Sequence, residues 1–201
     1  MEPGSEPTLG AGRYTAQELL RNWLTHHICS SGAEVGFRSR MLHLLDSSER
    51  PLSRDQFDPG HFTASAFVLS PGEDALLLLR HRKLGRWLQP GGHIEPGDRS
   101  VADAARREVH EETGLPLAAL DAVTVGIFDL DIHPIPVHGD EPAHHHFDVR
   151  FLFRSRVDTF DPIKAEAEAT EIRWIPLGGV ADLSDGSVFR VIPRIQSVRV
   201  S

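Results

Sequence analysis

Three glutamates near the middle of the chain have the spacing of one helical face. Glu108, Glu111 and Glu112 stand in the segment REVHEETGL, residues 107–115. Side chains three and four positions apart are neighbours on a helix, and each like-charge pair there costs roughly 0.2–0.5 kcal/mol. The helix dipole before Gly114 disfavours the same anions. A solvated acidic helix would bear these costs, whereas a bound divalent cation would reverse them, and Mg²⁺ takes oxygen ligands together with substrate phosphates.

A pair of glycines upstream fits the same chemistry. Gly91 and Gly92 follow a short predicted strand. Because glycine has no side chain, the backbone can approach a ligand closely there and can direct a carbonyl oxygen at a metal. The glycines alone would indicate only a turn, but together with the glutamates they favour a metal site.

The helix that carries the glutamates has recognisable ends. Ser100 is a typical N-terminal capping residue, Gly114 can take the left-handed conformation that ends a helix, and Pro116 prevents continuation. We therefore expect a helix over residues 100–113, with apolar side chains along one side for packing.

Strands and helices mix irregularly along the rest of the chain. The patterns predict helices over residues 15–27 and 33–45, strands over 61–69, 75–81, 123–131, 146–157 and 171–176, and a helix over 186–198 that Pro193 disturbs. Without a regular β-α alternation, a mixed α/β sandwich is favoured over a doubly wound sheet. We divide the chain into an N-terminal helical extension with its linker, residues 1–55, and a main domain, residues 56–201.

Charge and composition exclude several classes of protein. The net charge is −8, and residues 91–201 hold 19 acidic and 11 basic side chains. Such a surface repels phosphate backbones, so no nucleic-acid partner is expected. No apolar run is long enough to span a membrane, and no secretory signal is visible at the N-terminus. The single cysteine, Cys29, excludes an internal disulfide framework. We expect a cytoplasmic protein.

The stretch from Gly92 to Leu115 resembles the signature of the Nudix (MutT-like) hydrolases. That signature is Gly, five residues, Glu, seven residues, then Arg-Glu-apolar-x-Glu-Glu-x-Gly-apolar. Residues 107–115 fill every position of its second half. Two departures occur: Asp98 stands in place of the intermediate Glu, and eight residues rather than seven separate it from Arg107.

The resemblance implies a fold, a reaction and a cofactor. The implied fold is an α/β/α sandwich with a mixed sheet, and the substrate is a nucleoside diphosphate linked to another group. By the same resemblance, Mg²⁺ or Mn²⁺ would be held by Glu108, Glu111 and Glu112, with the Gly91 carbonyl as a further ligand. Metal ions in such sites neutralise phosphate charge and activate a water.

The resemblance also implies a general base, which must lie within hydrogen-bond reach of the attacking water. In family members the base comes from the signature helix, here Glu111, or from a later loop. The later candidate is Glu168, with Glu166 and Glu171 as rivals, and a merely charged loop is the alternative. Arg107 lies one turn before Glu111 and can orient its carboxylate by an ion pair.

Basic and aromatic residues before the glycines could contact the substrate. Arg80 and Arg82 alternate onto one strand face, and Arg binds phosphate oxygens bidentately. Trp87 and Phe128 could stack on a base, although a place in the core is the favoured interpretation for each. Gly92 would allow close approach of the substrate.

The run His144–His146 also suggests a metal. On a strand, His144 and His146 share a face, and imidazole suits zinc, copper or nickel. No matching cysteine or carboxylate spacing accompanies them, so a polar strand start is preferred.

Several functions remain open at this level. The leading one is hydrolysis of a nucleoside triphosphate, including an oxidised one. ADP-ribose or a nucleotide sugar is the alternative substrate, and a nucleotide-sensing module without catalysis is the alternative class. The N-terminal helices could also serve as a dimer arm, which leaves a homodimer as a further expectation.

Overall fold

A mixed sheet forms the centre of the molecule in the computed structural model, which describes residues 14–82, 85–159 and 169–198. The described strands are β1 (Gly60–Leu69), β2 (Ala75–His81), β3 (Trp87–Leu88), β4 (Gly91–His93), β5 (Leu120–Ala122), β6 (Asp129–Ile135), β7 (His144–Ser155) and β8 (Ala169–Pro176). Their main order is β3-β2-β1-β7-β5, while β4 pairs with β1, β6 with β7, and β8 with β2. The β1–β7 pair is parallel and the remaining pairs are antiparallel.

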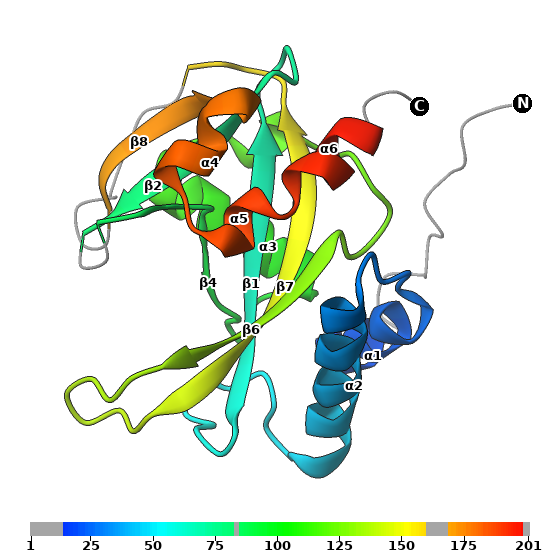
Figure 1. The fold of residues 1–201 in the computed structure, drawn as a ribbon. Helices are drawn as coiled ribbons and strands as arrows, with labels where there is room; N and C mark the ends of the chain where they lie inside the picture. The colour runs from blue at the N-terminus through cyan, green and yellow to red at the C-terminus, as the bar shows by residue number, and fades with distance from the viewer. Residues whose placement is uncertain (1–13, 83–84, 160–168, 199–201) are drawn as a thin grey trace, which may run out of the picture.

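Helical layers cover both faces of this sheet (Figure 1). One face packs against α1 (Ala16–His26), α2 (Gly32–Ser47) and α3 (Val101–Thr113), and the other packs against α4 (Val180–Leu183), α5 (Gly186–Phe189) and α6 (Ile192–Val198). Two 3-10 turns, Leu117–Ala119 and Leu177–Gly179, connect elements. The predicted α/β/α sandwich with a mixed sheet is therefore confirmed.

The first two helices join the same hydrophobic core as the sheet. Thr15 and Glu18 form a capping box at the start of α1, with the Thr15 amide donating to Glu18 Oε2 at 2.7 Å. Leu20 and Leu24 of α1 and Met41 of α2 belong to one buried hydrophobic cluster with residues of β1, β7 and α3. The N-terminal helices thus cover part of the sheet.

Two sequence-based boundaries were wrong. The strand predicted over 123–131 is divided between β5 and β6, because Gly126 takes a left-handed φ of 77° that a strand cannot contain. The helix predicted over 186–198 is two helices, α5 and α6. Pro193 is the second residue of α6, where its missing N–H costs nothing, so it begins a new helix instead of interrupting one. No helix among the described residues is long and apolar enough to cross a membrane.

Candidate functional site

The acidic helix α3 forms as the sequence predicts. Ser100 Oγ accepts a hydrogen bond from the Asp103 amide at 3.1 Å, and Gly114 ends the helix with a φ of 75°. Val101, Ala105 and Val109 are fully buried in the core under α3. Burial of this apolar side fixes the rotation of the helix and so positions its glutamates beside the glycine strand β4.

Arg107 is the centre of the site. Its Nη1 atom lies 2.9 Å from a carboxylate oxygen of both Glu108 and Glu111. Its Nε and Nη2 atoms donate to the two carboxylate oxygens of Asp98 at 3.1 and 3.0 Å, and Nη2 also donates to the His93 carbonyl at 2.8 Å. The ion pair predicted between Arg107 and Glu111 is present. One guanidinium therefore ties the loop before α3, β4 and two helical carboxylates together.

The two glycines are required by close packing. A Cβ atom on Gly91 would stand 2.3 Å from Ser65 Cβ, and one on Gly92 would stand 2.7 Å from the Glu108 carboxyl carbon. The Gly91 amide also donates to Glu112 at 2.8 Å. Only glycine lets β4 lie between β1 and the acidic helix at this distance.

The two glutamates that contact Arg107 differ in how deeply they are buried. The Glu108 side chain is 14% exposed, and burial raises its pKa even though Arg107 opposes the shift. The Glu111 side chain is 53% exposed, so it is the more accessible to substrate and water. Burial alone would lower the pKa of Arg107, but Asp98 and Glu108 outweigh it and raise the pKa, which keeps the guanidinium charged.

A buried polar network lies beside the glycine strand, and sequence reasoning missed it. Asp148 accepts hydrogen bonds from Thr63 and Ser65 of β1 at 3.2 and 2.8 Å, and from Arg150 at 2.8 Å. Gln89, just before the glycines, donates to the same Ser65 at 3.3 Å. The network therefore links the loop before β4 to the strand that lies beneath it.

Arg150 extends this network to β6 and the C-terminal helices. Arg150 is 2% exposed and pairs with Asp129 and Asp131 at 3.3 and 3.0 Å, while Arg190 pairs with the same two aspartates. Burial raises the pKa of Asp129. Burial would also raise that of Asp131, but His133 and the arginines lower it to about 2. The available signal was the alternation of charges at 129, 131, 148 and 150 within otherwise apolar strands.

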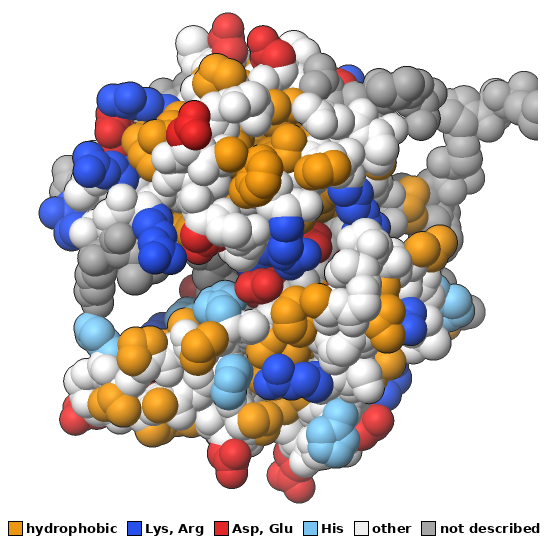
Figure 2. Space-filling model, viewed as in Figure 1, with side chains coloured by type: hydrophobic (Ala, Val, Ile, Leu, Met, Phe, Trp, Pro, Cys, Tyr) orange, Lys and Arg blue, Asp and Glu red, His pale blue; other side chains and the backbone are white. Residues whose placement is uncertain are grey.

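Five histidines gather at the end of this network. His61, His93, His133, His144 and His146 come from β1, β4, β6 and β7, with centroid distances between neighbouring rings of 4.9–5.5 Å. Burial and mutual repulsion lower the pKa of His146 to about 2 and that of His93 to about 4. In the space-filling view, histidines lie at the edge of the hollow that separates the β6–β7 hairpin from the rest of this face (Figure 2).

The residues predicted to contact substrate have different surroundings. Arg80 and Arg82 are exposed, Arg80 on β2 and Arg82 just beyond its end. Trp87 is 7% exposed and packs in the core under α4–α6, with the Arg173 guanidinium 5.6 Å from its ring centroid. Phe128 is buried in the same core. Glu168 and its rival Glu166 lie outside the described residues, whereas Glu171 belongs to β8 and pairs with Arg173.

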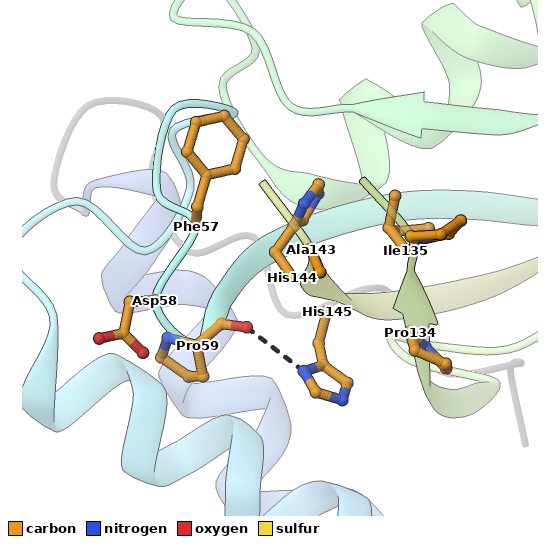
Figure 3. A pocket seen from close by; sticks show the side chains of 9 residues that line it. Phe57, Asp58, Pro59, Pro134, Ile135, Ala143, His144 and His145 are labelled. Atoms are coloured by element: carbon orange, nitrogen blue, oxygen red, sulfur yellow. Dashed lines mark hydrogen bonds between the residues drawn. The ribbon is translucent and has the colours of Figure 1, made fainter. Parts of the chain in front are cut away.

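One member of the histidine cluster, His144, lines a pocket (Figure 3). Residues before β1 and beside the turn of the β6–β7 hairpin line it: Phe57, Asp58, Pro59, Pro134, Ile135, Pro136, Ala143, His144 and His145. His145 Nδ1 lies 3.4 Å from the Pro59 carbonyl oxygen, which joins the hairpin to this loop. The Arg107 site contributes no residue to this lining.

The glycine strand, the acidic helix and the sandwich together define an enzyme of the pyrophosphohydrolase class. A family model described as NUDIX domain matches residues 59–193. The chain therefore belongs to the Nudix family.

Similar proteins agree with this family. A Lactococcus lactis subsp. cremoris protein named "Probable DHNTP pyrophosphohydrolase" is 35% identical over 140 residues, which cover 69% of this chain and 76% of that protein. A Bacillus subtilis protein whose name proposes an 8-oxo-dGTP diphosphatase is 43% identical over 68 residues, or 33% of this chain and 44% of that protein. The structure of a NUDIX-family hydrolase from Clostridium perfringens has the same fold, with a TM-score of 0.50, 20% identity, and coverage of 69% of this chain and 97% of that one.

Proposed function

We propose that the protein hydrolyses a phosphoanhydride bond of a nucleoside triphosphate, including an oxidised one, in a reaction that depends on Mg²⁺ or Mn²⁺. The observation that carries this proposal is the set of helical carboxylates around Arg107, pressed against two glycines. The names of the Lactococcus and Bacillus relatives, which both concern triphosphate compounds, support the choice of substrate.

The residues present fit a hard divalent cation. Glu108, Glu111, Glu112 and the Gly91 carbonyl offer oxygen donors only, which is the chemistry that Mg²⁺ and Mn²⁺ select. The space that a Cβ on Gly92 would fill is the space into which Glu108 projects. These residues would hold the ion, and the ion when bound would neutralise phosphate charge and acidify a water.

The protein's own groups have separable roles in this proposal. Arg107 orients Glu108 and Glu111 and balances their charge. Glu111, the more exposed carboxylate, is the described candidate for accepting a proton from the attacking water, and Glu168 remains the candidate from the later loop. Arg80 and Arg82 would supply positive charge for the polyphosphate, Gly92 would permit its approach, and Trp87 stays a proposed base contact despite its burial.

A hydrolysis screen tests this function. Nucleoside triphosphates, 8-oxo-dGTP, ADP-ribose, nucleotide sugars and dinucleotides would be incubated with the protein and Mg²⁺ or Mn²⁺, and products separated by ion-exchange chromatography. We expect monophosphate and pyrophosphate from a triphosphate. In Glu111→Gln, kcat should fall by orders of magnitude, whereas the exposed control Glu49→Gln should keep full activity. Full activity in Glu111→Gln would overturn the proposal, and tight binding without turnover would indicate a sensing module.

A further inference from the structure

The histidine cluster contains a triangle of rings from two neighbouring strands. His61 of β1 is the in-register partner of His146 of β7, and His144 lies two residues before His146 on the same strand face. Their ring centroids are 5.1 Å apart for His61–His144, 4.9 Å for His61–His146 and 5.2 Å for His144–His146. One nitrogen from each ring lies within 4.8 Å of the other two. The three rings therefore lie close enough together to contact one bound ion.

Backbone carbonyls hold two of these rings in the same tautomer. His61 Nδ1 is 2.9 Å from the Gln56 carbonyl oxygen, and His144 Nδ1 is 2.8 Å from the Pro142 carbonyl oxygen. Because a carbonyl oxygen can only accept, Nδ1 carries the proton in both rings and Nε2 keeps its lone pair. Histidines that bind metals are commonly oriented by such a bond from the other ring nitrogen.

The lone pair on His61 Nε2 is buried and accepts no hydrogen bond from the described residues. His61 is 1% exposed, and its Nε2 atom has no hydrogen-bond partner within the described ranges. A buried polar atom left unpaired costs roughly 1–3 kcal/mol, so such atoms are rare in folded proteins. A cation bound at this atom would use the lone pair that the protein leaves unsatisfied.

We propose that His61, His144 and His146 bind a divalent transition-metal ion of the Zn²⁺ type, at a site distinct from the helical carboxylates. Imidazole nitrogen suits Zn²⁺, Cu²⁺ and Ni²⁺, whereas Mg²⁺ selects oxygen. Three histidines leave the fourth position of a tetrahedral Zn²⁺ site open to water. His144 also lines the pocket, beside Phe57 in Figure 3, so one of the three proposed ligands borders this pocket.

The two sites are neighbours but share no ligand. His93 stands between them, because its ring is 5.1 Å from that of His61 and its carbonyl accepts a hydrogen bond from Arg107 at 2.8 Å. An ion on the three histidines would join β1 to β7 near the turn that connects β6 to β7. It would therefore stabilise the strands on which the Arg107 site rests, independently of whether that site hydrolyses a nucleotide.

Zinc binding to untagged, full-length protein tests this proposal. The protein would be dialysed against a chelator and titrated with Zn²⁺ by calorimetry in the presence of excess Mg²⁺. We expect one Zn²⁺ per chain and a raised Tm. His144→Gln and His146→Gln should each lose at least roughly tenfold in affinity. His145→Gln, on the opposite face of the strand, and Glu108→Gln should keep wild-type Zn²⁺ affinity.

X-ray absorption at the zinc edge identifies the atoms around Zn²⁺ in the wild-type protein, so the test does not depend on whether a variant folds. The wild-type protein loaded with one Zn²⁺ should show nitrogen neighbours at about 2.0 Å with the outer-shell scattering of three imidazoles. An all-oxygen shell, loss of Zn²⁺ in excess Mg²⁺, or unchanged Zn²⁺ affinity in both His144→Gln and His146→Gln would overturn the proposal. None of these outcomes depends on nucleotide hydrolysis, so failure here and failure of the proposed enzymatic function are distinguishable.

Discussion

Arg107 and Asp98 face each other across the loop that precedes α3, and two hydrogen bonds of 3.1 and 3.0 Å join the guanidinium to the carboxylate. Asp98 Oδ2 also accepts from the Glu95 amide at 2.8 Å, so the same carboxylate closes the loop on itself. The Asp98 side chain is only 8% exposed. Asp98, which departs from the family signature, therefore positions the arginine that in turn positions Glu108 and Glu111.

Replacing Arg107 with lysine tests whether the planar guanidinium group, and not only its charge, is needed for stability and activity. Lysine keeps the charge but cannot contact Asp98, His93 and two glutamates in one geometry. Since hydrogen bonds to charged groups contribute roughly 1.5–3 kcal/mol, we expect Arg107→Lys to lower the free energy of unfolding by about 2 kcal/mol and to lower kcat. Urea unfolding and steady-state kinetics measure the two effects.

The matched control is Arg99→Lys. Arg99 also pairs with a carboxylate, Asp103 at 3.0 Å, but its side chain is 86% exposed. Exposed pairs contribute about 0–1 kcal/mol, so this variant should behave like the wild type. If Arg107→Lys and Arg99→Lys changed the unfolding free energy and kcat equally, the buried hydrogen bonds of Arg107 would not be the cause of its effect.

Gly92→Ala should affect catalysis more than stability. The added Cβ would meet the Glu108 carboxyl group, the end of a flexible side chain that can turn away. Turning away breaks the 2.9 Å contact between Glu108 and Arg107. We expect kcat to fall by at least an order of magnitude while Tm changes little. Gly97→Ala, with open space around it, is the control, and its activity should be unchanged.

Gly91→Ala should instead affect folding. Its Cβ would stand 2.3 Å from Ser65 Cβ, 2.7 Å from Ser65 Cα and 2.8 Å from the Ala64 carbonyl oxygen, and backbone atoms cannot move aside separately. Overpacking of this kind costs roughly 1–3 kcal/mol. Chemical denaturation should therefore show a lower unfolding free energy for Gly91→Ala than for Gly92→Ala. A lower unfolding free energy for Gly92→Ala than for Gly91→Ala would contradict the conclusion that Gly91 matters for folding and Gly92 for catalysis.

The sequence predicted features that depend on neighbouring residues better than features that depend on residues far apart in the chain. The ends of α3 were predictable because Ser100 and Gly114 act through neighbouring backbone groups. The strand over 123–131 failed because its pattern does not show that Gly126 must adopt a positive φ. His61 and His146 are 85 positions apart, so only the parallel pairing of β1 and β7 brings them together. Arg150 was missed because the aspartates that make its burial tolerable come from different strands.

Glu34 makes folding stability depend on pH. Its side chain is fully buried in α2, where His27 lies 2.6 Å and Arg194 3.4 Å from one carboxylate oxygen. Burial alone would raise the pKa of Glu34, but hydrogen bonds from His27 and Ser30 outweigh it and lower the pKa from 4.5 to about 2. A carboxyl group with a lowered folded-state pKa stabilises the fold above its unfolded value and loses that contribution as the pH falls.

The expected contribution of Glu34 is about 3 kcal/mol at neutral pH, lost progressively between about pH 4.5 and pH 2. Urea unfolding of the wild type and of Glu34→Gln across this range isolates it, because the other carboxylates titrate in both proteins. The difference in unfolding free energy between the two should be large at pH 7 and should shrink as the pH falls below 4.5. A difference that stays constant over that range would show that the ionised Glu34 carboxylate does not stabilise the fold.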